Sequence, residues 1–119
     1  MEKNIKELSG ERKFSLVGLV ILYNPPASVV DNIKTYIAGL EKLYVVDNSE
    51  TNIEQIKECI LQIPNIEYIK NDENMGIAYP INYILNRIKG EHEFLLTMDQ
   101  DSYFDDNGIC LYIEEAEKC

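Results

Sequence analysis

The sequence has no tryptophan, one histidine and three cysteines, and the few histidines and cysteines limit the metal and redox sites that it could form. His92 is the only imidazole available to a metal. The cysteines are Cys59, Cys110 and Cys119, and no two of them have the C-x-x-C spacing of a zinc or dithiol redox site. An odd number of scattered cysteines is typical of a reducing compartment. Cys59 occupies an apolar position of a helical pattern, so we expect it in the core.

Long apolar runs are also missing. No run approaches the ~18 residues that a membrane-spanning helix requires, and the longest extends from Leu16 to Tyr23. Residues 1–13 are charged and lack the apolar centre of a signal peptide. We therefore expect a cytoplasmic protein, with residues 1–13 as an N-terminal extension and residues 14–119 as one domain.

Positive charge is scarce as well. The chain has 11 Lys and Arg against 21 Asp and Glu, which gives a formal net charge of −10. Much of this excess lies in the last quarter of the sequence. Such a surface repels a phosphate backbone, so nucleic acid is not an expected partner. A ligand that carries phosphate would need a cation to accompany it.

Four apolar segments of strand length alternate with helical patterns. The predicted strands are 16–22, 43–47, 66–70 and 94–98. Apolar residues at helical spacing mark the helices between them, and a further helix is predicted within 103–118. The second helix opens with Thr51-x-x-Glu54, which is the pattern of a capping box. This alternation predicts an α/β fold: a Rossmann-like parallel sheet of order 3-2-1-4 with helices on both faces.

Asp99 and Asp101 stand directly after the last apolar segment. On an extended backbone the side chains of residues i and i+2 share one side, whereas Gln100 would point away. Two carboxylates this close repel each other unless a cation lies between them, and hard divalent cations prefer oxygen ligands. The pair therefore suggests a metal site. The alternative is that an acidic stretch only ends a strand and begins a turn.

Polar residues also follow the other three strands. Asn24 follows the first, Asp47 and Asn48 follow the second, and Asn74 and Gly76 follow the third. In a sheet of order 3-2-1-4 these ends meet at one edge, where ligands bind. Asp47 could accept hydrogen bonds from a base or a ribose, and Gly76 allows a turn with positive φ. The alternative is that these residues only cap helices and form turns.

Two common phosphate-binding motifs are absent. The sequence has no G-x-x-x-x-G-K-[ST], which excludes a P-loop, and Asn24-Pro25-Pro26 stands where a dinucleotide-binding G-x-G-x-x-G would follow the first strand. Phosphotransfer proteins of similar strand order also gather acids at strand ends. They place a Lys after the last strand, and here none follows Asp101 closely.

Four segments in order carry a resemblance to a known family. They are Val20–Asn24, Val45–Ser49, Asn74–Ala78 together with Asn82, and Met98–Ser102. Over about residues 16–103 the chain resembles the nucleotide-binding half of a family 2 glycosyltransferase with the A-type fold. Met98–Ser102 is similar to the family's D-x-D motif. Its D-Q-D-S form, with N-x-G-I-A, is most similar to the bacterial rhamnosyltransferase branch.

The resemblance implies a nucleoside-diphosphate sugar as donor, dTDP-rhamnose or a UDP-sugar, and Mg²⁺ or Mn²⁺ as cofactor. An acceptor hydroxyl would attack the anomeric carbon of the donor sugar and invert its configuration. The reaction would belong to bacterial polysaccharide synthesis, with a glycan acceptor at the inner face of the membrane. Asp99 and Asp101 would hold the metal. The residues that the resemblance assigns to the donor are Tyr23, Asn24, Asp47, Asn48, Asn74, Gly76, Asn82 and Asp99.

The sequence departs from the family in two ways. Pro80 and Ile84 stand where the family has small residues. The chain also stops soon after the D-x-D, so the half that supplies the acceptor platform and the general base has no counterpart, and no catalytic residue is assigned. We expect a truncated, donor-binding part of an enzyme. The alternatives are a catalytically inactive nucleotide-binding module and a fragment that self-associates into a homo-oligomer through an exposed sheet edge.

Overall fold

The computed structural model describes residues 16–76, 78–88, 94–105 and 108. Its centre is a four-stranded parallel sheet in the order β3-β2-β1-β4. The strands are β1 (Leu16–Leu22), β2 (Lys42–Asp47), β3 (Ile66–Lys70) and β4 (Phe94–Asp99). This confirms the predicted α/β class and strand order. The N-terminal extension and most of the helix predicted within 103–118 lie outside the described residues.

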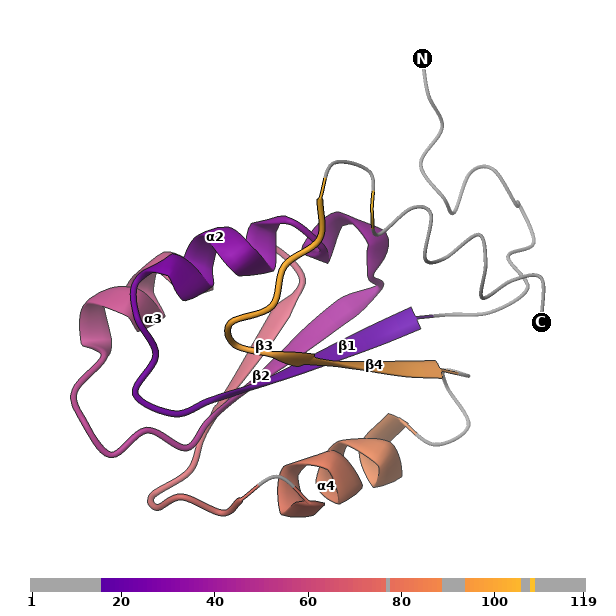
Figure 1. Ribbon diagram of the computed structural model, residues 1–119. Helices are drawn as coiled ribbons and strands as arrows, with labels where there is room; N and C mark the ends of the chain where they lie inside the picture. The colour runs from indigo at the N-terminus through magenta and orange to yellow at the C-terminus, as the bar shows by residue number, and fades with distance from the viewer. Residues whose placement is uncertain (1–15, 77, 89–93, 106–107, 109–119) are drawn as a thin grey trace.

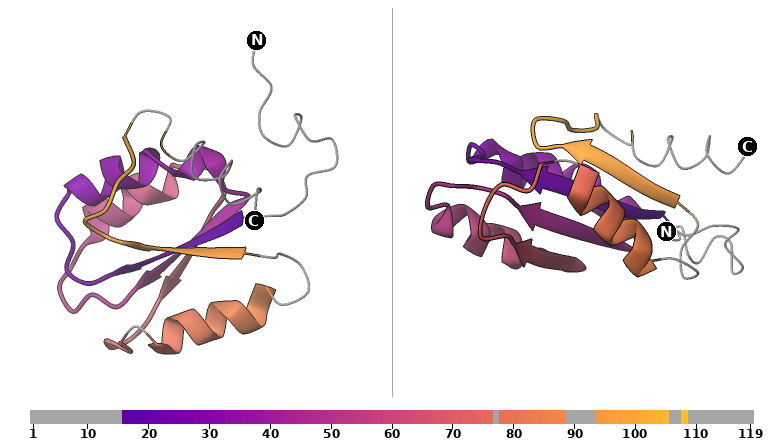
Figure 2. Two further views of the ribbon diagram at one scale, coloured as in Figure 1. Left: turned by 45° about the vertical axis from the view of Figure 1, so that its right-hand side comes forward. Right: turned by 90° about the horizontal axis from the view of Figure 1, so that it is seen from below.

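Helices cover both faces of the sheet, as predicted. One face carries α2 (Ser28–Lys34), the 3₁₀ helix η1 (Ile37–Gly39) and α3 (Glu54–Leu61), and the other carries α4 (Ala78–Ile88) (Figure 1). The two turned views of Figure 2 show the same layers. None of the helices in the described ranges is long and apolar enough to cross a membrane.

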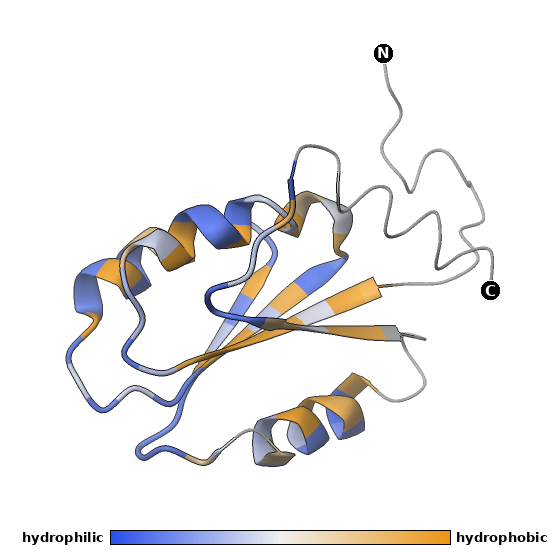
Figure 3. Ribbon diagram, in the orientation of Figure 1, coloured by the Kyte–Doolittle hydropathy of each residue, from blue (hydrophilic) through white to orange (hydrophobic). Residues whose placement is uncertain are grey.

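Strand β1 occupies the centre of the sheet and is buried on both faces. Leu16, Val20 and Leu22 belong to the core cluster under α2 and α3, whereas Val17 and Leu19 belong to the cluster under α4. Figure 3 shows the resulting apolar colouring along β1 and on the inner sides of the helices. Because both faces of the strand are covered, its sequence is nearly continuous in apolar residues.

Parallel pairing brings the carboxyl ends of three strands together. In the register of the sheet, Leu22 lies opposite Asp47 of β2, and Ile21 lies opposite Asp99 of β4. The residues that follow β1, β2 and β4 therefore meet at one edge. This is the edge at which ligands bind in open parallel sheets.

Three local predictions were wrong. Apolar residues at helical spacing from Val29 to Leu40 predict one first helix, but this helix ends at Lys34 and its apolar pattern continues in η1. No capping box forms at α3: the Thr51 hydroxyl donates to Asn24 Oδ1, and Asn52 Oδ1 instead accepts the Glu54 N–H.

Cys59 is the third of these corrections, because it is exposed rather than in the core. Ile56 and Ile60 of the same helix define the side that packs on the sheet. Cys59 lies one residue before Ile60, and successive residues of an α-helix are about 100° apart around its axis, since a turn contains about 3.6 residues. Its side chain therefore falls outside the packed stripe.

Candidate functional site

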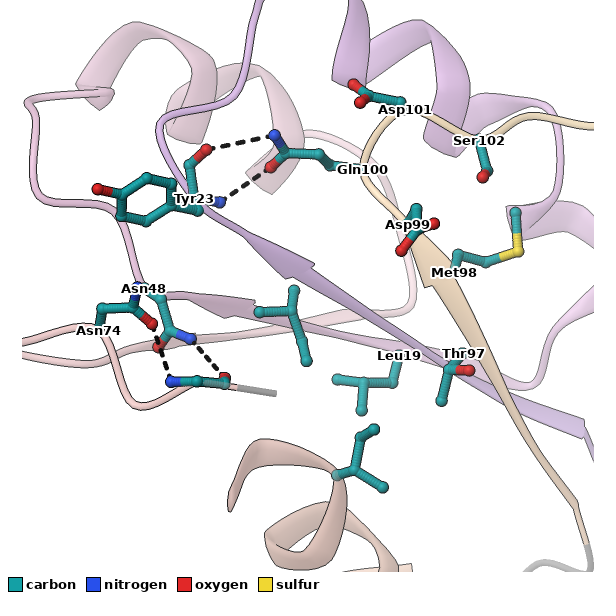
Figure 4. Close-up of a pocket in the computed structure, with 13 residues that line it drawn as sticks. Leu19, Tyr23, Asn48, Asn74, Thr97, Met98, Asp99, Gln100, Asp101 and Ser102 are labelled. Atoms are coloured by element: carbon teal, nitrogen blue, oxygen red, sulfur yellow. Dashed lines mark hydrogen bonds between the residues drawn. The ribbon is translucent and has the colours of Figure 1, made fainter. Parts of the chain in front are cut away.

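A cavity of about 630 Å³ opens at the carboxyl ends of β1 and β4, on the side of the sheet that α4 covers (Figure 4). Its lining combines apolar residues of the sheet and α4 with polar residues of the loops. The lining residues are Leu19, Ile21, Tyr23, Asn48, Asn74, Gly76, Ile81, Thr97, Met98, Asp99, Gln100, Asp101 and Ser102.

Most of the residues predicted from the sequence line this cavity. The structure brings together Tyr23, Asn48, Asn74, Gly76, Asp99 and Asp101. The other predicted residues do not line it: Asn24 and Asp47 lie in the hydrogen-bond networks described below, and Asn82 is exposed on α4.

The two carboxylates of the D-Q-D segment lie in a turn rather than on one extended strand. Strand β4 ends at Asp99, and the Ser102 N–H donates to the Asp99 carbonyl at 3.0 Å, which closes a turn over residues 99–102. The predicted extended arrangement was therefore wrong. Figure 4 shows the side chains of Asp99 and Asp101 pointing in different directions.

Both carboxylates are exposed and available to a ligand. Within the part of the chain that the structure describes, the side chains of Asp99 and Asp101 make no hydrogen bond and no ion pair. Among these residues there is also no cluster of three or more His, Cys, Asp or Glu that could hold a metal. The protein thus offers two free carboxylates here, and a cation would take its other ligands from elsewhere.

Asp47 at the end of β2 is 1% exposed, and protein donors satisfy both of its carboxylate oxygens. Oδ1 accepts the Ser49 N–H at 2.8 Å, and Oδ2 accepts the Tyr68 hydroxyl at 2.6 Å. Burial and this hydrogen bond raise the pKa of Tyr68 above its usual range. Asp47 therefore organises the end of β2 in this structure, and its contact with a base stays a prediction.

Asn24 joins the end of β1 to the loop that follows β2. Its φ is 44°, in the left-handed region that Asn tolerates better than most residues. Its Oδ1 accepts the N–H groups of Glu50 and Thr51 and the Thr51 hydroxyl at 3.0, 3.1 and 2.9 Å, and its own N–H donates to Ser49 Oγ at 2.9 Å. Asn24 thereby fixes the backbone next to Tyr23.

The ring of Tyr23 is 43% exposed and forms one wall of the cavity. Its hydroxyl donates to Glu50 Oε1 at 3.0 Å, and this hydrogen bond raises the pKa of Tyr23. The ring is thus tethered at its hydroxyl, and the residue is partly exposed at the cavity.

The loop after β3 is held against the sheet by amides. The buried Asn48 donates through Nδ2 to the Gly76 carbonyl at 3.0 Å and accepts Asn71 Nδ2 at 2.7 Å. The Gly76 N–H donates to Asn74 Oδ1 at 2.8 Å. Gly76 has φ 76°, as predicted for this turn, and a Cβ there would meet no atom within 4 Å. The backbone conformation rather than space therefore favours glycine.

Sequence reasoning missed the apolar lining of the cavity and the contacts of Gln100, the middle residue of D-Q-D. Leu19 and Ile21 lie two residues apart on β1, and Tyr23 follows at the same spacing. The period of two along a strand could have found this set. No local signal identifies Gln100, whose contacts lie 77 residues away in the sequence.

Residues 19–118 match the model of glycosyl transferase family 2, and the chain therefore belongs to this family. Among solved structures, S. aureus TarS 1–349 has a similar fold, with a TM-score of 0.60 and 22% sequence identity. The match covers 87% of this chain and 32% of that chain, so the chain spans about a third of the TarS structure. No curated protein sequence matches the chain.

Proposed function

We propose that the chain is the donor-binding part of a glycosyltransferase, and that its cavity takes a nucleoside-diphosphate sugar. The expected donor is dTDP-rhamnose or a UDP-sugar, and the expected acceptor is a hydroxyl of a bacterial polysaccharide at the inner face of the membrane. One observation carries the proposal in a chain of this family: Asp99 and Asp101 present unpaired carboxylates to the cavity that the Tyr23 ring borders.

The residues present fit a divalent cation. No Lys or Arg lines the cavity among the described residues, and the chain has a net charge of −10, so a cation would offset the repulsion between a diphosphate and the two carboxylates. Mg²⁺ uses one or two carboxylates and takes substrate phosphates and water as its other ligands. Asp99 and Asp101 would hold Mg²⁺ or Mn²⁺ in this way. The cation would neutralise the charge that develops on the departing nucleoside diphosphate.

The other residues of the site would bind and orient the donor. The partly exposed Tyr23 ring at the cavity would suit stacking of a base, because aromatic rings stack on planar heterocycles. The loop of Asn74 and Gly76, held by Asn48, would contribute to the binding of the donor, because both residues line the cavity. We assign no general base to the described residues, so the proposal covers donor binding and does not extend to turnover by this chain alone.

Thermal unfolding with dTDP, UDP and GDP, each with and without Mn²⁺, tests the proposal. A ligand at 100 times its Kd adds about 2.7 kcal/mol of stability, which raises the midpoint by roughly 10 °C in a domain of this size. The expected result is a Mn²⁺-dependent rise with dTDP or UDP that Asp99→Asn and Asp101→Asn abolish. The matched control is Asp31→Asn, which changes an exposed carboxylate in the first turn of α2.

Two results would count against the proposal. The first is an unchanged midpoint with every nucleotide, and the second is a rise that Asp99→Asn and Asp101→Asn leave intact. In the first case, sedimentation at several concentrations would show whether the chain instead self-associates.

A further inference from the structure

The side chain of Gln100 continues the β1–β4 ladder beyond the point where the strands end. The last paired residues are Ile21 and Asp99. Past them, the Tyr23 N–H donates to Gln100 Oε1 at 2.9 Å, and Gln100 Nε2 donates to the Tyr23 carbonyl at 3.2 Å. The side-chain amide thus offers Tyr23 one donor and one acceptor, as the backbone of a neighbouring strand would.

The backbone of Gln100 is fixed as well. Its carbonyl accepts a hydrogen bond from Asn32 Nδ2 of α2 at 3.0 Å. Three contacts therefore hold the chain at Asp99 and Gln100. Asp99 pairs with β1, the Gln100 side chain bonds to the Tyr23 backbone, and the Gln100 carbonyl bonds to α2. Figure 4 shows the two dashed bonds from Gln100 to Tyr23 beside the two carboxylates.

The carboxylates themselves have no such support. Neither Asp99 nor Asp101 has a side-chain partner among the described residues, and Asp101 lies beyond the end of β4. Their positions therefore depend on the backbone of the turn that carries them. A binding site whose groups are held in place by their neighbours loses less conformational freedom when it binds its ligand.

We propose that Gln100 is a positioning residue of the donor site, and that its bonds to Tyr23 fix the two carboxylates relative to the Tyr23 ring. The inference rests on the proposed function. It predicts that the affinity for the cation and the position of the Tyr23 ring both depend on the side-chain amide of Gln100. Gln100 itself need not touch the ligand.

The test compares Gln100→Met with the wild-type chain. Methionine has a similar length and no amide, so it removes both bonds to Tyr23 with little change in volume. Two hydrogen bonds in the lower half of their usual range of net strength correspond to roughly tenfold in an equilibrium constant. We expect Mn²⁺ to bind about tenfold more weakly in the presence of UDP or dTDP, as measured by electron paramagnetic resonance of the free ion.

A second readout observes the bonds directly. Hydrogen exchange of the Tyr23 amide, followed by NMR without ligand, should be about tenfold faster in Gln100→Met, because Gln100 Oε1 accepts that N–H. Asn32→Ala leaves the bonds to Tyr23 and removes only the bond to the Gln100 carbonyl, so it should weaken Mn²⁺ binding by about threefold. The control is Gln55→Met, the same change on an exposed position of α3.

The outcomes separate the inference from the proposed function. If Gln100→Met accelerates exchange at Tyr23 but binds Mn²⁺ and nucleotide as tightly as the wild type, the positioning role is wrong and the donor site stands. Unchanged exchange at Tyr23, or an equal loss of binding in Gln55→Met, would also overturn the positioning role. If the wild-type chain binds neither nucleotide with Mn²⁺, the proposed function fails and the inference fails with it.

Discussion

Replacing Tyr68 by Phe should destabilise the fold, although Tyr68 does not line the cavity. The Tyr68 hydroxyl donates to Asp47 Oδ2 at 2.6 Å, and Asp47 is 1% exposed. Tyr68→Phe keeps the ring and leaves the buried carboxylate with a hydrogen bond from the Ser49 N–H. A hydrogen bond to a charged group contributes about 1.5–3 kcal/mol. We expect a loss of about 2 kcal/mol in the free energy of unfolding.

This loss should be visible as a shift in the unfolding midpoint. For domains near the length of this chain, 119 residues, 1 kcal/mol corresponds to about 4 °C. The midpoint of Tyr68→Phe should therefore fall by about 8 °C. Tyr103→Phe is the control, because it makes the same change on a ring that is 63% exposed. Equal midpoints for the two variants would refute the assigned role of the Tyr68–Asp47 bond.

The same bond predicts a dependence of stability on alkaline pH. Burial and the bond to Asp47 raise the pKa of Tyr68, so the folded chain keeps a proton that an unfolded tyrosine loses above about pH 10. Below that pH the two states bind this proton equally. Above it the unfolded state binds fewer protons, and the free energy of unfolding falls as the pH rises.

Urea unfolding between pH 8 and 11 should show a smaller fall for Tyr68→Phe than for the wild type. Some fall should remain, because burial also raises the pKa of Tyr36. A Tyr68→Phe variant that loses stability above pH 10 as steeply as the wild type would contradict this explanation.

Three further substitutions test other parts of the fold by chemical denaturation. Asn24→Gly should be more stable than Asn24→Ala by about 1 kcal/mol, since only glycine adopts φ 44° without strain, and the reverse order would contradict the role of that conformation. Gly18→Ala should lower stability by about 1–3 kcal/mol, because its Cβ would lie 2.6 Å from a Leu40 methyl group in the core, and a neutral result would show that the leucine moves away freely. Glu67→Gln removes the ion pairs with Lys42 and Arg87 on the surface, so it should change the free energy of unfolding by less than about 1 kcal/mol. A larger loss that persists in 1 M salt would contradict the weak contribution expected of surface ion pairs.

The fold could be predicted because its determinants are local. Each strand is an apolar segment with clear boundaries, and right-handed β-α-β connections leave few strand orders. Two of the wrong predictions depend on where an element stops or on what its end contacts. Strand β4 ends at Asp99, so the period of two could not place Asp101. The Thr51 hydroxyl bonds to Asn24 rather than to its own helix, and no local pattern contains that alternative partner.

The residues of the site were found more readily than their roles. The carboxyl ends of parallel strands indicated Asn48, Asp99 and Asp101, and the family resemblance added Tyr23. All four line the cavity, and their part in donor binding stays a prediction. Hydrogen bonds between segments distant in sequence could not be predicted, because they depend on the final register of the sheet. The bond between Tyr68 and Asp47 spans 21 residues, and the bond between Gln100 and Tyr23 spans 77.

Mapping a nucleotide onto the folded chain by NMR tests most directly whether this cavity binds the donor. The chain, labelled with ¹⁵N, is titrated with UDP and with dTDP in the presence of Mg²⁺. We predict that with at least one of them the largest amide shift changes lie at Tyr23, Asn48, Gly76 and Gln100, and that they are lost in Asp99→Asn. Changes centred on α3 around Cys59, or no changes with either nucleotide, would contradict the assignment of a donor site to this cavity.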